Sequence, residues 1–218
     1  MKIKWLGHSC FLITSEGGTK ILTDPYQPGG FDGAIMHGPI LELVDVVTIS
    51  HDHADHGYVK GLPGAPVVLR SAGDFVASGI KFDGIQAFHD EAGGTKRGKD
   101  VVFTFAVDGV KVCHCGDLGH VLTKDQAAHI GAVDVLLIPV GGFFTIGPDE
   151  AWQVADQLAA KVVIPMHFKT PKVGFPIGPV DDFTNGKANV KRLGKSEVEI
   201  KKDSLPVERE IVVLEPAL

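Results

Sequence analysis

Cysteine is scarce in this sequence, since Cys10, Cys113 and Cys115 are the only three among 218 residues. An odd count without a regular spacing gives no disulfide framework. Disulfides are rare in reducing compartments, so we expect free thiols and a cytoplasmic protein. We interpret Cys115 as a small core residue, with a thiolate ligand to a metal as the alternative.

Long hydrophobic runs are lacking as well. No segment approaches the roughly 20 apolar residues of a membrane-spanning helix. The opening stretch MKIKWLGHSCFLITSEGG has only a short apolar part and no small-residue cleavage pattern, which argues against a secretory signal peptide. We therefore expect no association with a membrane.

Positive charge is not concentrated anywhere in the chain. The formal net charge is −6 and no long basic run occurs, whereas binding to nucleic-acid phosphates usually needs a basic face. Nucleic acid is therefore disfavoured, and we expect a small-molecule substrate, with assembly into a homo-oligomer left open. Two bound divalent ions would bring the net charge to about −2, so a local site could still attract an anion.

Apolar runs that end at turn residues predict a chain rich in strands. A hydrophobic content of 44% suffices for one sizeable core, and no break in composition divides the chain, so we expect a single domain over residues 1–218. The expected strands cover residues 2–6, 10–14, 19–25, 43–50, 66–70, 80–88, 100–107, 109–115, 133–142, 161–167, 196–202 and 209–216. Helices are expected near 125–131 and 148–160, and a long loop over 171–186. Two loosely similar halves of this kind indicate two sheets covered by helices.

The stretch SHDHADHG, at residues 50–57, follows a buried-strand pattern and is unusually rich in ionisable side chains. His51 and His53 are two residues apart, so on an extended segment they point the same way and can bind one ion. Asp55 and His56 come where the chain turns and can face a second ion. Imidazole and carboxylate groups suit zinc and related divalent metals. The alternative interpretation is a solvated, polar start of a helix.

Three more candidate ligands lie directly after other predicted strands. His89 ends IQAFH, Asp117 follows VKVCHCG, and His167 ends VVIPMH. Rigid strands aim the side chains at their ends, which is why binding sites collect there. We therefore expect these residues to meet the histidine-rich segment if the strand directions agree.

These residues together resemble the metallo-β-lactamase-fold hydrolase superfamily. The matching positions are Asp24 in LTDP, the H-x-H-x-D-H motif at 51–56, His89, Asp117 in GDLGH and His167. The segments GHSCFLI, HDEAGGTKRG and CGDLGH look like a compact branch that includes L-ascorbate-6-phosphate lactonase-like proteins and other Zn-dependent hydrolases. The resemblance extends from residue 3 to about residue 170.

The resemblance implies a four-layer αββα sandwich, of the α/β (α+β) class, with two divalent metal ions. The implied ligands are His51, His53 and His89 for the first ion, Asp55, His56 and His167 for the second, and Asp117 between the two. Asp24 would orient the histidine segment from behind. Zinc is the expected metal, although manganese, iron and nickel accept similar ligands.

Such a pair of ions lowers the pKa of a shared water, so that hydroxide is present near neutral pH and can attack a carbonyl or phosphoryl centre. Asp55 would accept or relay a proton. The leading interpretation is therefore a metal-dependent hydrolase of a small anionic substrate, a lactone or a phosphoester. The alternatives are a phosphodiesterase or nuclease of the same fold, a non-catalytic metal-binding sensor, and an oxygen-reducing diiron centre.

The other histidines are interpreted one by one. His120 is a candidate catalytic residue, because it follows Asp117 closely and could protonate a leaving group. His8 lies in a turn that the resemblance places near the metals. We interpret His114 as buried and structural, and His37 and His129 as ordinary surface or loop residues.

Three loops supply candidate substrate contacts. In HDEAGGTKRG, Lys96 and Arg97 would bind an anionic group, unless the segment is only a solvated hairpin tip. In GGFFTIG, Phe143 or Phe144 would form an apolar wall over the substrate. Residues 170–183 are long enough to form a lid.

Overall fold

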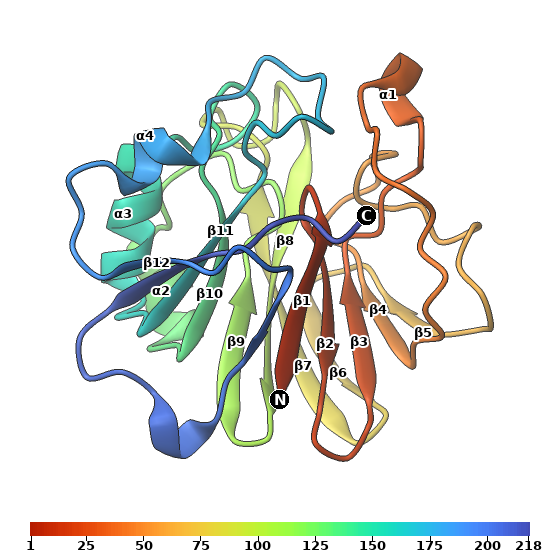
Figure 1. Ribbon diagram of the computed structural model, residues 1–218, viewed down its shortest axis with the longest axis horizontal. Coiled ribbons are helices and arrows are strands. Elements are labelled where there is room, and N and C mark those ends of the chain that lie inside the picture. Colours follow the sequence, from red (N-terminus) through yellow and green to blue (C-terminus); the bar gives the residue numbers. More distant parts are fainter.

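The computed structural model describes residues 1–218 and places two β-sheets face to face (Figure 1). The first sheet has the strand order β13-β1-β2-β3-β4-β5, and the second has the order β12-β14-β11-β10-β9-β8-β7-β6. The strands of the first sheet are β1 (Lys2–Gly7), β2 (Cys10–Thr14), β3 (Lys20–Thr23), β4 (Val46–Thr48), β5 (Val67–Leu69) and β13 (Glu197–Glu199). Those of the second are β6 (Gly73–Ala77), β7 (Ile80–Phe88), β8 (Lys99–Val107), β9 (Val110–His114), β10 (Val135–Pro139), β11 (Val162–Met166), β12 (Val190–Arg192) and β14 (Glu210–Val213).

The longer helices all lie on one side of this sandwich. α2 (Lys124–Ile130), α3 (Pro148–Gln157) and α4 (Val180–Thr184) lie beside β10–β12, whereas α1 (Gly30–Gly33) is a single turn on the opposite side (Figure 1). A capping box at Thr123 begins α2. Pro148 and two acidic residues in the first turn begin α3, which suits the helix dipole. A 3₁₀ turn covers Lys202–Ser204, and no helix combines the length and apolar character that crossing a membrane requires.

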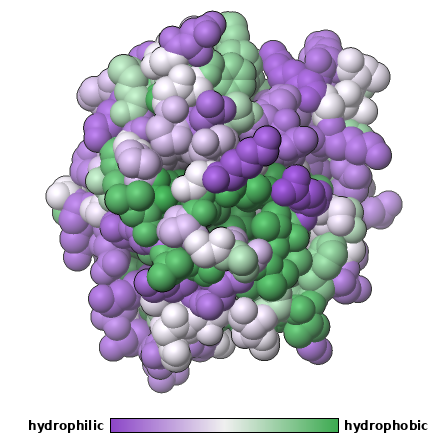
Figure 2. All heavy atoms as spheres, turned by 90° about the vertical axis from the view of Figure 1, so that its right-hand side faces the viewer, coloured by the Kyte–Doolittle hydropathy of each residue, from purple (hydrophilic) through white to green (hydrophobic).

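Irregular segments cover the outer face of the first sheet, where the predicted sandwich has its fourth layer. Tyr26, Ile35 and Ile40 come from the segment after β3 and pack on Leu12 and Leu22 of the sheet in a buried cluster of their own. That segment is rich in glycine and proline, which disfavour helix. The two-sheet fold class is confirmed, but loops take the place of helices in this layer. Figure 2 shows this side of the molecule, with hydrophobic side chains gathered at its centre.

The main core lies between the two sheets and beneath the helices. It contains 48 buried residues that include Trp5 and Phe11 of the first sheet and Phe103 and Phe105 of the second. Full burial of such side chains contributes roughly 1.5–3 kcal/mol each. The sheets are therefore held together independently of any ion, which makes them a rigid support for the loops at their edge.

Apart from the 3₁₀ turn, four short elements were not predicted from the sequence, namely α1, α4, β6 and β12. β6 and β12 are short edge strands with mostly exposed residues, and neither shows the regular alternation of apolar and polar residues that marks a strand. α4 lies within residues 171–186, which were predicted to be a loop. Its Phe183 is fully buried, and its ring stacks on Trp152 of α3 at a centroid distance of 5.0 Å. Packing on α3, rather than local helix propensity, fixes this turn.

The strand directions bring several strand ends to one edge of the sandwich. β7 and β9 both pair antiparallel with β8, and β9 pairs parallel with β10, which in turn pairs parallel with β11. β7, β9 and β11 therefore end at the same edge. His89, Asp117 and His167 follow these three ends, so the predicted agreement of strand directions is confirmed.

Candidate metal centre

The histidine-rich segment leaves β4 in a series of tight turns rather than as an extended strand. The backbone N–H groups of His56 and Gly57 both donate to the carbonyl oxygen of His53, over 3.0 and 2.7 Å. His51 and His53 still converge, because Nε2 of the first lies 2.9 Å from Nδ1 of the second. The predicted convergence is thus present, but a turn produces it instead of the alternation of a strand.

An outer cluster consists of three imidazoles: His51, His53 and His89. Their ligand atoms all lie within 4.8 Å of one another. His53 is the most exposed of the three. His89 can lie there because Gly119 of the next loop packs directly on its backbone, and a Cβ at that glycine would lie 2.3 Å from the carbonyl carbon of His89.

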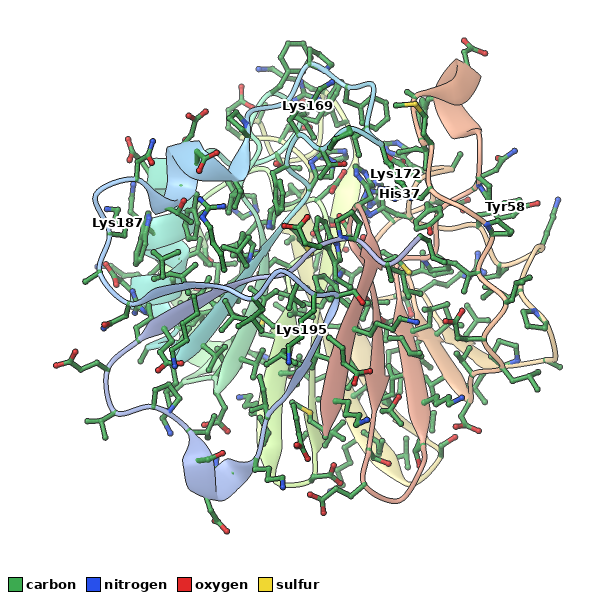
Figure 3. All side chains as sticks on the ribbon, in the orientation of Figure 1. His37, Tyr58, Lys169, Lys172, Lys187 and Lys195 are labelled. Carbon is green, nitrogen blue, oxygen red and sulfur yellow. The ribbon has the colours of Figure 1, made fainter.

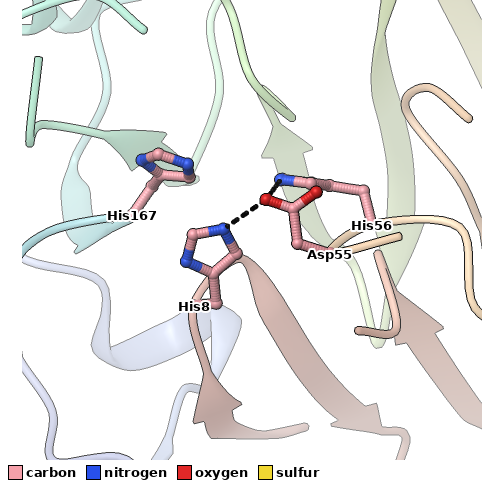
Figure 4. A group of neighbouring side chains, drawn as sticks. All are labelled: His8, Asp55, His56 and His167. Carbon is pink, nitrogen blue, oxygen red and sulfur yellow. Dashed lines mark hydrogen bonds and ion pairs between the residues drawn. The ribbon is translucent and has the colours of Figure 1, made fainter. Parts of the chain in front are cut away.

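An inner cluster consists of Asp55, His56, His167 and His8, all of them buried (Figure 4). Nε2 of His8 lies 3.1 Å from Oδ2 of Asp55. The carbonyl oxygen of His8 accepts bonds from the Trp5 indole at 2.9 Å and from the backbone N–H of His167 at 3.2 Å. These bonds tie the turn that carries His8 to the strand end that carries His167.

Asp117 lies between the two clusters. Its Oδ2 is 3.1 Å from Nε2 of His56, 3.4 Å from Nε2 of His89 and 3.9 Å from Nε2 of His51. Its Oδ1 is 3.5 Å from Nε2 of His167. A single carboxylate therefore faces donors of both the outer and the inner cluster.

The pKa shifts favour neutral imidazoles at His53, His89 and His167 and an ionised carboxylate at Asp117, whereas His56 retains a proton. Burial lowers the pKa of His167 to about 3, and burial also lowers the pKa of His53 and His89. Burial alone would raise the pKa of Asp117, but the imidazoles of His167 and His56 outweigh it and hold that pKa well below its usual range. Burial opposes a charge on His56 too, yet Asp117 and Asp55 raise its pKa. The field that retains a proton on His56 is the field that attracts a metal cation.

Asp24 supports the inner cluster from behind. Its carboxylate accepts bonds from the backbone N–H of Ser50 at 2.8 Å and from the Ser50 hydroxyl at 2.6 Å, and it lies 2.8 Å from Nδ1 of His56. Such an arrangement holds the ring with Nε2 directed forward, as carboxylates behind metal-binding histidines do. The backbones of His8, Asp24 and His167 all adopt left-handed conformations, with φ of 53°, 40° and 51°. Strain of this kind is common at functional sites.

Asp100 is a supporting residue that sequence reasoning missed. It is fully buried, its Oδ1 accepts a bond from the backbone N–H of Asp117 at 3.2 Å, and the same atom lies 3.6 Å from Nδ1 of His51. The available signal is a carboxylate at the start of the apolar strand DVVFTF, where it had to be buried or paired.

The donor atoms fit a divalent metal. Buried polar atoms normally have hydrogen-bond partners, yet Oδ1 of Asp55 and Oδ1 of Asp117 have none. Both belong to carboxylates, which bind zinc and related ions. The unpartnered atoms therefore mark positions where a cation would complete the coordination.

Of the remaining site candidates, His120 holds a loop, whereas Phe144 and Arg97 line the cavity over the donors. The Phe88 N–H donates to Nε2 of His120 over 3.2 Å, and Nδ1 lies 2.8 Å from the carbonyl oxygen of Val121. Both ring nitrogens hold the loop, so the structure does not support the predicted catalytic role of His120. Phe143 is 64% exposed, and Phe144 is the member of that pair that lines the cavity over the donors. Arg97 lines the same cavity.

Three further histidines, His37, His114 and His129, lie outside both clusters. His114 is buried, with Nε2 2.9 Å from the carbonyl oxygen of Ser9, and the side chain of His129 is exposed, both as expected. His37 lies in a loop, which is one of the two predicted placements, but it is not a surface residue, because only 2% of it is exposed beside the end of β1 (Figure 3). The His37 ring packs directly on Gly7, and a Cβ atom at that glycine would lie only 2.4 Å from Cε1 of the ring. Cys115 is a buried free thiol, in agreement with a core residue.

Comparisons with known proteins agree with this geometry. The family model described as Beta-lactamase superfamily domain matches residues 2–167. Relatives named UPF0173 metal-dependent hydrolase are 32% identical in Methanoculleus marisnigri and 33% identical in Methanospirillum hungatei. Both alignments cover 78% of this chain, with 82% and 84% of the relatives. A crystal structure from Thermotoga maritima, of a protein proposed to be a Zn-dependent hydrolase of the metallo-β-lactamase superfamily, superposes with a TM-score of 0.80 and 43% identity over 98% of both chains. The chain belongs to the metallo-β-lactamase superfamily and is one of its metal-dependent hydrolases.

Proposed function

We propose that this hydrolase works with two divalent metal ions and cleaves a small anionic substrate, a lactone or a phosphoester. The observation that carries the proposal is the position of Asp117, whose two oxygens face donors of both clusters within 3.1–3.9 Å. His51, His53 and His89 would hold one ion, and Asp55, His56 and His167 the other. Zinc fits these donors, and manganese, iron and nickel accept similar ones.

A bound pair of divalent ions supplies water activation near neutral pH and positive charge against which negative charge can develop. The chain's own residues orient the attacking water. Asp55 lines the cavity, and although burial works to raise its pKa, His56 and His8 hold that pKa below its usual range. It therefore stays ionised and can accept a hydrogen bond from the attacking water, which orients that water toward the substrate.

His8 acts on the reaction through Asp55 in this proposal. With Oδ2 of Asp55 held by His8 at 3.1 Å, the unpartnered Oδ1 is left to face a cation. His8 is thus a positioning residue for the inner cluster. Asp24 has the same role toward His56.

A substrate panel tests the proposal against the phosphodiesterase and nuclease alternatives. Purified protein loaded in turn with zinc, manganese and iron would be assayed on lactones, phosphomonoesters, bis-p-nitrophenyl phosphate and single-stranded RNA, with Asp117→Asn as the matched inactive control. We expect hydrolysis of a lactone or a small phosphoester that the control does not catalyse. Cleavage of RNA at low enzyme concentration, with no turnover of the small substrates, would contradict the proposal. Oxygen consumption by the iron-loaded protein in place of hydrolysis would favour the diiron alternative.

A further inference from the structure

The cavity over the metal donors has two kinds of lining. Its volume is about 360 Å³, at the small end of the range for ligand pockets. The floor consists of donor residues from both clusters. The wall consists of Phe31, Phe144 and Phe175 together with Arg97. A polar, reactive floor is therefore enclosed by an aromatic rim that carries one positive charge.

The three phenylalanines come from separate segments and meet at this cavity. Phe175 packs edge to face with Phe31 at a centroid distance of 5.5 Å and with Phe144 at 5.6 Å. Phe31 is half exposed and belongs to neither buried core cluster. Single exposed phenylalanines are common, but three that converge on a cavity form an apolar surface that a ligand can cover.

Arg97 is held firmly at the same rim. The carboxylate of Asp90 accepts backbone N–H bonds from Ala92, Gly94, Lys96 and Arg97 at 2.7–2.9 Å, which fixes the loop. The guanidinium donates to the carbonyl oxygen of Phe143 over 3.1 Å and lies 5.7 Å from the centre of the Phe144 ring. No carboxylate is paired with it, whereas the neighbouring Lys96 pairs with Glu91. Its charge is therefore available to an anionic group of a ligand.

We propose that the substrate is an amphiphilic organic anion, in which a carboxylate or phosphate bound by Arg97 accompanies an aryl or acyl arm that packs on Phe31, Phe144 and Phe175. This inference rests on the proposed function. Water would add at the carbonyl carbon or the phosphorus atom, the bond to the leaving oxygen would break, and that oxygen would take up the proton. A polyhydroxylated sugar phosphate does not match the wall, because its hydroxyl groups would lose water against phenyl rings without gaining partners.

Binding of small anions to the zinc-loaded protein tests this assignment without turnover. Calorimetry would compare 4-phenylbutyrate with butyrate, with 4-phenyl-1-butanol and with glucose 6-phosphate. We expect 4-phenylbutyrate to bind about 10-fold more tightly than butyrate, because its ring covers the aromatic wall. Phe175→Ala should remove this ratio, and so should Phe31→Ala, which alters a half-exposed side chain. Arg97→Gln should weaken both carboxylates by a similar factor and leave the alcohol unchanged.

Two substitutions serve as controls. Lys96→Gln alters the neighbour of Arg97, and Val76→Ala alters an exposed side chain on β6; neither side chain lines the cavity. Both should leave the ratio as it is. Glucose 6-phosphate binding as tightly as 4-phenylbutyrate, or a ratio that survives Phe31→Ala and Phe175→Ala, would overturn the assignment. If the ratio behaves as expected while the substrate panel shows no hydrolysis, the proposed function fails and the binding preference stands. If hydrolysis occurs but 4-phenylbutyrate binds no more tightly than butyrate, only the proposed preference for an amphiphilic anion is wrong.

Discussion

The outer and inner clusters are built from similar side chains in different surroundings. The outer cluster holds three imidazoles, reaches the cavity through the exposed His53, and shares only Asp117 as a carboxylate. The inner cluster is fully buried, contains Asp55, and is supported by Asp24 and His8. Burial and negative charge strengthen the attraction of a cation, because the dielectric screening is weaker. We therefore expect the inner position to bind its ion more tightly and the outer position to exchange with solvent.

The largest effect should come from the residue that the two clusters share. Asp117→Asn keeps the volume of the side chain and removes its charge, so both clusters lose their common carboxylate. We expect kcat/KM to fall on the order of 10³-fold or more, since groups that stabilise developing charge cost 10²–10³ each. Metal analysis should show fewer than two ions per chain. Loss of activity with two ions retained would mean that Asp117 does not link the clusters.

A residue behind the inner cluster should have the next effect. Asp24→Ala leaves the N–H and hydroxyl of Ser50 and Nδ1 of His56 without their acceptor. We expect a 10–100-fold loss of affinity for the inner ion and about 1–3 kcal/mol of lost stability per buried group left unpartnered. Competition with a chelator and chemical denaturation measure the two losses. The Ser50 hydroxyl also lies 2.9 Å from Nδ1 of His51, so a smaller weakening of the outer ion is expected as well. A larger loss at the outer ion than at the inner one would contradict the role of Asp24 behind the inner cluster.

His8 tests the difference between the clusters, because the metal donors that it contacts, Asp55, His56 and His167, all belong to the inner cluster. His8→Phe removes the hydrogen bond to Asp55 and should weaken the inner ion by 10–100-fold, whereas His8→Gln can still donate to that carboxylate and should lose less. In an Asp55→Asn background, His8→Phe should add little if His8 acts through Asp55. An undiminished effect in that background would instead make His8 a direct ligand.

The smallest effect concerns His37, which is buried outside both clusters. Burial lowers the pKa of His37 to about 4, while the unfolded chain has a value near 6.5. The unfolded state therefore binds the proton first, so stability is full above about pH 6.5 and falls as the pH drops toward 4. We expect the free energy of unfolding of metal-saturated His37→Gln to fall less steeply from pH 7 to pH 5 than that of the wild type. A wild-type slope in His37→Gln would refute the role of His37.

The sequence supports some of these conclusions better than others. The spacing of His51 to His56 and the strand ends before His89, Asp117 and His167 are local patterns, so the donor residues could be named in advance. The aromatic wall could not, because Phe31, Phe144 and Phe175 meet only through the packing of three separate loops. His37 has no local signal of burial, since Gly7 and the chain near Leu218 enclose it from far along the sequence. His120 follows Asp117 closely, yet its ring turns away to hold Phe88 and Val121.

Anomalous diffraction at the zinc edge, from crystals of the zinc-loaded protein, tests the central claim most directly. We predict two zinc peaks per chain, one among His51, His53 and His89 and one among Asp55, His56 and His167, with Asp117 in contact with both. In crystals soaked briefly with chelator, the outer peak should fade first. A single peak per chain, or peaks away from these residues, would contradict the account of a paired metal centre.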